Sequence, residues 1–551
     1  MRCHRFLRST MLLYVPLVCL LISVSLARAA ATKPFIADAV IDPDRSRVPE
    51  GKLTIGVHVS LSPKWLNPQD TPGAMANELV WKMHDYMIKA AQGNLYSYSL
   101  AEFYDMSPDF KVATVRLREG LKFHNGDPVT AEDVKFAYEN YHGINAAFLH
   151  EKAEHVEIVD DRTVKFHFKE PFLDFLLYYG TTASAAGVII PKNYYLSLGS
   201  TNAERDEKFA QAPIGAGPYK FVRQEPGIEV EFTAFPDYWR EVPHVKTIVS
   251  RGVRELPVRV AALKSGEADF AYFITGELLQ SVMNDPQLRY HPNNSAPFWL
   301  MFPDMDDPKS PFHDMRVRKA VSLALDRQYL ADQETAGMAI PWGNFIPPEW
   351  PGAVQRPPDE FDLKEAKRLM AEAGYAKGFS IDWFTPFPAV ESLSLRIMEQ
   401  LREIGIKSQM NVMERPVYMQ KLLEGKPKDG YGHKGFPGRQ IVMSISVIPG
   451  DASLYVDNWL RCGGSYSFIC DKRIDALWER YLASRDRQER EDLMKQAQNI
   501  ALDEHMFVPI YINSFTLGVG PRIAGQPADY IRTPMSVLPS PPEDFKLQSG
   551  R

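Results

Sequence analysis

The sequence predicts an α/β protein of two or three domains, for three reasons. The chain has 551 residues, of which 45% are hydrophobic, so it is globular and too long for a single hydrophobic core. Residues 113–141 have the pattern of a strand, a tight turn and a helix. Residues 381–413 have the pattern of a strand, a helix and a second strand, which implies a parallel strand pair with a right-handed crossover.

Residues 1–31 have the pattern of a secretory signal peptide. Arginines precede the apolar run Met11–Leu26, and either Ala27-Arg28-Ala29 or Ala29-Ala30-Ala31 offers small residues at the two positions that signal peptidase reads. The run has about 16 residues, fewer than the roughly 20 that a membrane-spanning helix needs. Cys19 is not preceded by the small residues expected before a lipidated cysteine. We therefore expect Sec-type export without a lipid anchor, and a mature protein in the periplasm.

The charge of the chain excludes one class of partner. The full chain has 63 Lys and Arg against 69 Asp and Glu, a net charge of −6. The predicted cleavage removes four arginines, so the mature protein has a net charge of about −10. We therefore expect it to bind neither nucleic acid nor an anionic membrane surface.

Two of the four cysteines, Cys462 and Cys470, remain after the predicted cleavage. Two cysteines this close in sequence favour a disulfide in an oxidising compartment. A zinc site would need two further ligands nearby, and the sequence shows none. We therefore predict a structural disulfide that closes a small loop, and no metal site.

Residues 113–141 carry the clearest local pattern. Ala113, Val115 and Leu117 alternate with polar residues, as in a half-buried strand. Asn125-Gly126 permits a tight turn, and Thr130 can cap the helix that follows. One face of this helix is apolar, at Val134, Ala137, Tyr138 and Tyr141.

The other elements are predicted from the same two patterns, the alternation of apolar residues in strands and their spacing of three or four residues in helices. Alternating apolar residues predict a first strand at 52–60 and a hairpin at 156–169. Residues 71–189 are therefore expected to form a compact α+β insertion. Further helices are expected at 362–374 and 488–504, and a final strand at 507–512.

Six segments together resemble one family, the extracytoplasmic solute-binding proteins of family 5, which serve oligopeptide, dipeptide and nickel ABC importers. They are LREGLKFHNGDPVTAEDVKFAYE (117–139), PIGAGPYKF (213–221), ALKSGEADF (262–270), SPFHDMRVRKAVSLALDR (310–327), KRLMAEAGY (367–375) and DNWLRCGGSYSFICDKRIDALWERYL (457–482). Each segment alone is a weak signal. All six occur in the family's order across nearly the whole mature chain, which makes the resemblance specific.

The resemblance implies a two-lobed periplasmic binding protein fold, class II-like, with an extra α+β insertion domain. The core lobe would comprise 32–70, 190–296 and 506–551, the insertion 71–189, and the opposing lobe 297–505. Strands near 297–303 and 507–514 would form the hinge. The implied function is capture of a small peptide or peptide-like ligand by hinge closure and its delivery to an ABC importer permease in the inner membrane. We expect a monomer with no cofactor.

The resemblance also directs attention to five candidate ligand-binding residues. Trp65 and Asn67 lie in the loop after the first strand, where family members meet their ligand. Asp451, Tyr455 and Trp459 lie just before the cysteine loop, in a segment that faces the cleft in the family. For each of them a structural role in the protein core stays open. Dipeptide-binding relatives pair the amine of their ligand with an acidic residue in this neighbourhood. In this chain the six residues at 444–449 include no acid, so Asp451 is the acid in this segment that could take that role, and whether it does stays open.

Several other functions remain as alternatives. The ligand could be an opine, a sugar conjugate or a metal chelate, and the protein could serve a chemoreceptor or act as a chaperone. A secreted hydrolase is the remote alternative, because GGSYS at 463–467 fails the G-x-S-x-G pattern. His150 and His155 are also spaced wrongly for H-E-x-x-H. We therefore assign no catalytic residue and expect no enzyme activity.

Overall fold

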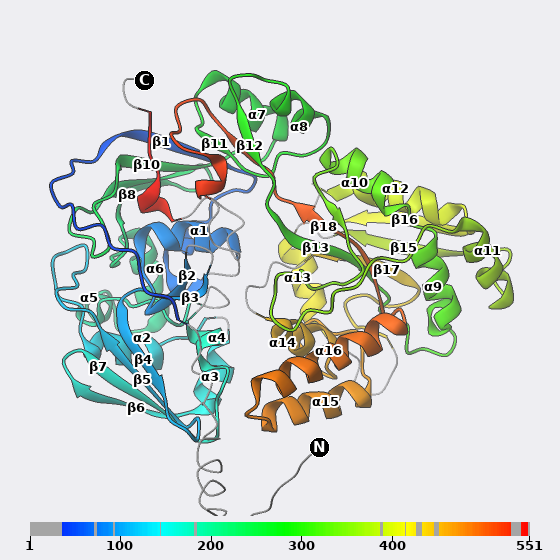
Figure 1. Ribbon diagram of the computed structural model, residues 1–551, viewed down its shortest axis with the longest axis horizontal. Helices are drawn as coiled ribbons and strands as arrows, with labels where there is room; N and C mark the ends of the chain where they lie inside the picture. Colours follow the sequence, from blue (N-terminus) through cyan, green and yellow to red (C-terminus); the bar gives the residue numbers. More distant parts are fainter. Residues whose placement is uncertain are drawn as a thin grey trace, which may run out of the picture. The chain divides into compact units, whose positions relative to one another are not determined.

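The structure is a computed structural model that describes residues 36–70, 74–91, 94–143, 145–180, 185–385, 390–413, 415–425, 432–445, 451–530 and 541–548. The predicted signal peptide lies outside these residues. The described residues form sheets of seven, six, four and two strands (Figure 1). We call the parts built on the seven-, six- and four-stranded sheets the core lobe, the opposing lobe and the insertion. Within the described chain, no helix is both long and apolar enough to cross a membrane.

The core lobe is built around the first strand, β1 (Glu50–Val57), which pairs in parallel with β10 and β11. Leu53, Ile55 and Val57 of β1 are buried, as their alternation in the sequence predicts. The strands lie in the order β12-β19-β11-β1-β10-β9-β8. The other elements are β8 (Tyr219–Glu225), β9 (Glu229–Ala234), β10 (Val245–Gly252), β11 (Phe270–Ala271), β12 (Arg289–His291), β19 (Leu517–Val519), α7 (Leu256–Ser265) and α8 (Gly276–Met283).

The insertion contains an antiparallel sheet of order β4-β5-β7-β6, and it confirms the predicted strand, turn and helix. Gly126 has φ +92° in the turn, and the Thr130 backbone N–H donates to Asp133 Oδ2 at 2.9 Å where the helix begins. The elements of this region are α1 (Ala74–Met83), β2 (Ile88–Ala91), β3 (Asn94–Tyr98), β4 (Ala101–Met106), β5 (Val112–Leu117), α2 (Ala131–Glu139), α3 (Ala146–Lys152), β6 (Ala153–Asp160), β7 (Thr163–Phe168), α4 (Phe175–Tyr179), α5 (Lys192–Ser197) and α6 (Asn202–Gln211).

The opposing lobe contains a mixed sheet of order β14-β18-β13-β17-β15-β16, with β15 and β16 parallel as predicted. The helix α12 connects these two strands. The elements are β13 (Asn294–Met301), α9 (Met315–Leu323), α10 (Arg327–Thr335), β14 (Ile340–Pro341), α11 (Leu363–Glu372), β15 (Phe379–Thr385), α12 (Glu391–Arg402), β16 (Ile406–Val412), α13 (Arg415–Leu423), β17 (Gln440–Ile445), α14 (Ala452–Tyr455), α15 (Lys472–Ala483), α16 (Arg487–Asp503) and β18 (Phe507–Ser514).

Two neighbouring connections carry the chain between the lobes, one from β12 to β13 and one from β18 to β19. β13 and β18 pair antiparallel in the opposing lobe, and β12 and β19, which lie next to them in the sequence, pair antiparallel in the core lobe. The two connections therefore run side by side, at 292–293 and 515–516 (Figure 1). Such paired connections are the positions where small backbone rotations would change the angle between two lobes.

Candidate functional site

The first candidate residues, Trp65 and Asn67, lie in and just after the short helix η1 (Pro63–Leu66) and have different environments. Trp65 is partly buried against the main hydrophobic core. Asn67 is fully buried, and its Nδ2 donates to Asp206 Oδ1 at 2.9 Å. Its Oδ1 accepts from the backbone N–H of Gln69 at 3.1 Å. In this structure, Asn67 therefore anchors η1 to α6, whereas part of the Trp65 ring is accessible.

Asp451 caps the N-terminus of α14, and its carboxyl has a raised pKa. Its Oδ1 accepts from the Ser453 backbone N–H at 2.8 Å and also from the Ser453 hydroxyl. Within the described part of the chain, no Lys or Arg forms an ion pair with it, although the charge of Arg490 acts on it. Burial, with the nearby charge of Asp174, raises the pKa of Asp451 to about 6. A half-buried carboxylate with no cation in contact favours either a proton or a cationic ligand group.

Three tyrosines, each from a different segment, surround this acidic region. Burial raises the pKa of Tyr96, Tyr178 and Tyr481, and the charge of Asp451 contributes to each shift. Tyr96 comes from β3, Tyr178 from α4 and Tyr481 from α15. Aromatic rings beside a carboxylate are a favourable environment for an ammonium group, because the ring faces and the acid both attract positive charge.

Tyr455 and Trp459 lie deeper than Asp451, within the second hydrophobic cluster of the opposing lobe. Trp459 is 3% exposed, and its ring meets that of Trp299 edge to face, with centroids 5.0 Å apart. Tyr455 is fully buried beside Phe345 and Trp350. Among the described residues, the Trp459 indole N–H has no hydrogen-bond acceptor. Both residues are therefore part of the packed core in this structure.

The predicted disulfide between Cys462 and Cys470 is present. The two sulfur atoms lie close to the carboxylate of Asp475, but sulfurs joined in a disulfide are not thiolate ligands for a metal ion. The backbone N–H of Cys462 donates to Asp475 Oδ1 at 2.9 Å, which fixes the loop to α15. The cysteine pair is therefore structural.

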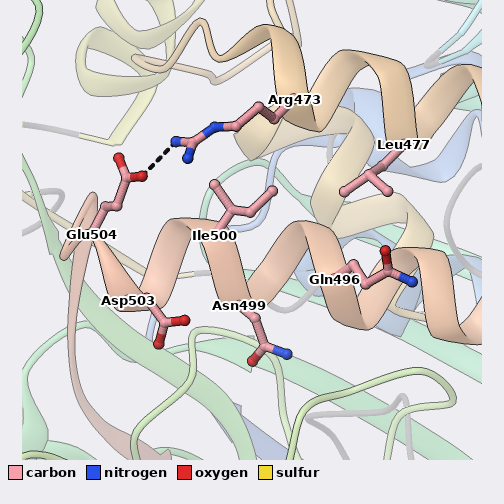
Figure 2. A pocket seen from close by; sticks show the side chains of 7 residues that line it. All are labelled: Arg473, Leu477, Gln496, Asn499, Ile500, Asp503 and Glu504. Atoms are coloured by element: carbon pink, nitrogen blue, oxygen red, sulfur yellow. Dashed lines mark hydrogen bonds and ion pairs between the residues drawn. The ribbon is translucent and has the colours of Figure 1, made fainter.

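A surface pocket of about 470 Å³ lies between α15 and α16, as Figure 2 shows. An ion pair between Arg473 and Glu504 spans one end of it. The residues that line it are Arg473, Leu477, Gln496, Asn499, Ile500, Asp503 and Glu504. None of the five candidate ligand-binding residues is among them, so we do not place the ligand there.

The structure also brings together residues that no sequence pattern indicated. Asp174, from the insertion, forms an ion pair with Arg490 of α16 and accepts a hydrogen bond from Tyr481 of α15 at 3.1 Å. Each of these residues lies on an unremarkable helix terminus or helix face in the sequence. Their proximity depends on how two parts of the chain meet, so no local signal could have identified them.

Comparisons with known proteins agree with this architecture. The model of the bacterial extracellular solute-binding proteins, family 5 (middle region), matches residues 96–466. The glutathione-binding protein GsiB of Salmonella typhi is 26% identical over 473 residues, covering 84% of this chain and 89% of its own.

Solved structures also share the fold. The ABC transporter substrate-binding protein CtaP from Listeria monocytogenes matches with a TM-score of 0.76 at 24% identity, covering 91% of this chain and 100% of its own. The periplasmic binding protein DppA from Helicobacter pylori, in complex with the peptide STSA, matches with a TM-score of 0.74 at 23% identity. The match covers 90% of this chain and 98% of DppA. These likenesses show that the two-lobed fold with an α+β insertion is shared.

Proposed function

The chain belongs to the bacterial extracellular solute-binding proteins of family 5, and from this premise we propose that it captures a peptide or peptide-like solute between its two lobes for an ABC importer. The family match carries the proposal, because it includes most of the insertion and most of the opposing lobe. A glutathione-binding protein and a peptide-bound structure among its relatives support a peptide-like ligand. The solute is bound and released unchanged, so the protein is not an enzyme.

We propose that the ligand meets Trp65 from the core lobe and Asp451 from the opposing lobe. The partly exposed ring of Trp65 offers an apolar surface that is tolerant of the ligand's side chains. The carboxylate of Asp451 has a raised pKa and contacts no cation among the described residues, which suits a ligand ammonium group. Trp459 and Tyr455 contribute indirectly, as packed residues that follow Asp451 and hold its segment in place. Asn67 contributes indirectly by holding the loop that carries Trp65.

The domain boundaries fit the same proposal. We place the core lobe in 32–70, 190–296 and 506–551, the insertion in 71–189 and the opposing lobe in 297–505. Within these ranges β18 joins the sheet of the opposing lobe, and α5 and α6 pack on the insertion. The paired connections between the lobes support a hinge at 292–293 and 515–516. Because a ligand can drive closure only through its preference for the closed form, it must contact both lobes.

The route of the protein to its site of action follows from its N-terminus. We propose that residues 1–31 are removed as a Sec-type signal peptide and that the mature monomer acts in the periplasm. Its partner is the permease of an ABC importer in the inner membrane, which receives the ligand-bound form.

The test begins with the mature chain, 32–551, purified from the periplasm. Mass spectrometry of small molecules released on unfolding should identify a peptide or peptide-like compound, recovered chemically intact. Calorimetry should then measure the affinity for glutathione, for the peptide Ser-Thr-Ser-Ala and for an opine. Binding of the opine alone would move the ligand outside the peptide class, and recovery of a chemically altered compound would contradict a binding function.

Two variants test the role of Asp451. Asp451→Asn should weaken binding of a peptide with a free amine about tenfold, because it removes one charge-assisted hydrogen bond. The N-acetylated form of the same peptide should bind wild type and variant alike. Asp471→Asn is the matched control, because Asp471 caps α15 as Asp451 caps α14. Equal losses for both forms of the peptide would remove Asp451 from the amine site.

A further inference from the structure

A group of contacts joins the insertion to the opposing lobe at a place remote from the hinge. Asp174 precedes α4 of the insertion, and its carboxylate forms an ion pair with Arg490 of α16. The Tyr481 hydroxyl donates to the same Asp174 oxygen at 3.1 Å. The Arg490 guanidinium also stacks 3.8 Å from the centre of the Tyr481 ring. We call Asp174, Tyr481 and Arg490 the latch.

Other contacts between the insertion and the opposing lobe flank the latch. Leu454 of α14 is 2% exposed and packs in a hydrophobic cluster whose other members all come from residues 80–216. Arg485, between α15 and α16, lies 5.8 Å from the ring centre of Phe110 in the insertion. The Tyr178 hydroxyl of α4 lies 3.5 Å from Asp457 Oδ2. The latch is therefore one of several contacts between the insertion and the opposing lobe, and Leu454 provides a buried apolar contact beside it.

The insertion is fixed firmly to the core lobe, so the latch connects the two lobes. The buried carboxylate of Asp85, next to α1, accepts from the Tyr238 hydroxyl and from the Trp239 indole N–H, both at 2.8 Å. Every residue of α4 is buried, which fixes the position of Asp174 within the insertion. A hinge motion that separates the insertion from the opposing lobe would therefore break the latch.

We propose that the latch stabilises contact between the lobes in the absence of ligand and thereby sets the fraction of molecules that are closed before ligand binds. This inference rests on the proposed function as a hinge-closing receptor. In this structure, which we take as the closed form, Asp174 and Arg490 are largely shielded from water and paired with each other, with side chains 19% and 10% exposed. In the open form, water would hydrate both charges separately. The apparent affinity for a ligand increases with the fraction of molecules that already have the closed conformation. Asp174 and Arg490 therefore act on ligand binding indirectly, as positioning residues that hold the two lobes together.

The experiment measures closure without any ligand. Dyes are placed on Glu119→Cys in the insertion and Glu399→Cys in the opposing lobe, whose side chains are 81% and 72% exposed. Single-molecule fluorescence energy transfer on the mature chain then gives the ratio of closed to open molecules. Asp174→Ala and Arg490→Ala should each lower this ratio about tenfold, the effect of losing one charge-assisted hydrogen bond. The double variant should be no lower than either single variant, because both remove the same interaction.

The controls separate the latch from a general loss of structure. Lys495→Ala removes a cation from the same helix, where Lys495 forms an exposed pair with Asp492, and should leave the ratio unchanged. Asp174→Asn keeps the shape of the side chain and should give an intermediate ratio even if Asp174→Ala folds poorly. A wild type that is entirely open without ligand, additive losses in the double variant, or an equal loss in Lys495→Ala would overturn the proposal. Because no ligand is added, these outcomes are independent of the peptide-binding test.

Discussion

Replacing Asp451 with asparagine should make the ligand-free protein more stable at neutral pH. Burial raises the pKa of Asp451 from 3.8 to about 6, so the folded protein binds its proton more tightly than the unfolded chain does. The contribution of this group to stability is therefore fully present below pH 3.8 and is lost as the pH rises through 6. Asparagine retains an oxygen that can accept from Ser453, and it has no charge to be desolvated.

The size of the effect follows from the shift in pKa. A rise from 3.8 to about 6 corresponds to ~3 kcal/mol at neutral pH, at about 1.36 kcal/mol for each pKa unit. Asp451 is only half-buried, so water screens part of this penalty and we take about half of it, ~1.5 kcal/mol. At pH 4.5, where the folded protein is mostly protonated at this group, the gain from Asp451→Asn should fall to ~0.5 kcal/mol.

Urea unfolding of wild type and variant at pH 7.5 and pH 4.5 checks this reasoning. Asp471→Asn is again the control: Asp471 also caps a helix, but its pairing with Arg473 lowers the pKa of its carboxyl. That variant should lose stability at pH 7.5 instead of gaining it. If Asp451→Asn destabilises the protein at pH 7.5, or gains the same amount at both pH values, the carboxylate is not held at a desolvation cost.

Three further predictions concern the rest of the site. Replacing Cys462 and Cys470 with serine should lower the free energy of unfolding by ~2 kcal/mol, since the disulfide closes only a short loop; reductant should shift the thermal unfolding of wild type but not of the variant. Trp459→Ala should cost about 3–5 kcal/mol in urea unfolding, because the side chain is 3% exposed, and a loss below ~1 kcal/mol would contradict its place in the core. Asn67→Ala should cost about 1–3 kcal/mol by removing the contact to Asp206. The contribution of Trp65 to the fluorescence, taken as the difference between spectra with and without Trp65→Phe, should change in Asn67→Ala; an unchanged difference would show that Asn67 does not hold the loop.

Elements with a strong local pattern were predicted from the sequence. The alternation at Ala113, Val115 and Leu117 corresponds to β5, and all three side chains are buried. Asp362 caps α11, and Gly374 follows that helix with φ +89°. These predictions hold because strand and helix periods and cap chemistry depend on residues only a few positions apart.

For the candidate ligand-binding residues, the sequence proposes positions, and the structure adds the neighbours of each side chain. Asn67 is a candidate for ligand contact, and the structure adds that its amide bonds to Asp206, 139 residues away. Trp459 is a candidate for which a core role stays open, and the structure shows that its ring packs against Trp299 of β13. Whether a polar or aromatic side chain points toward a ligand or into the core depends on neighbours that are distant in the sequence.

The sequence alone determined the family, the order of the elements and the cysteine pair, because each of these depends on residues that are near one another along the chain or on the order of motifs. Only the tertiary structure decided which charges meet. Arg490 and Asp174 are 316 residues apart, and their contact exists because the insertion and the opposing lobe meet at that point. Electrostatic energies depend on separation in space and on exposure to water, and neither quantity can be read from position in the sequence.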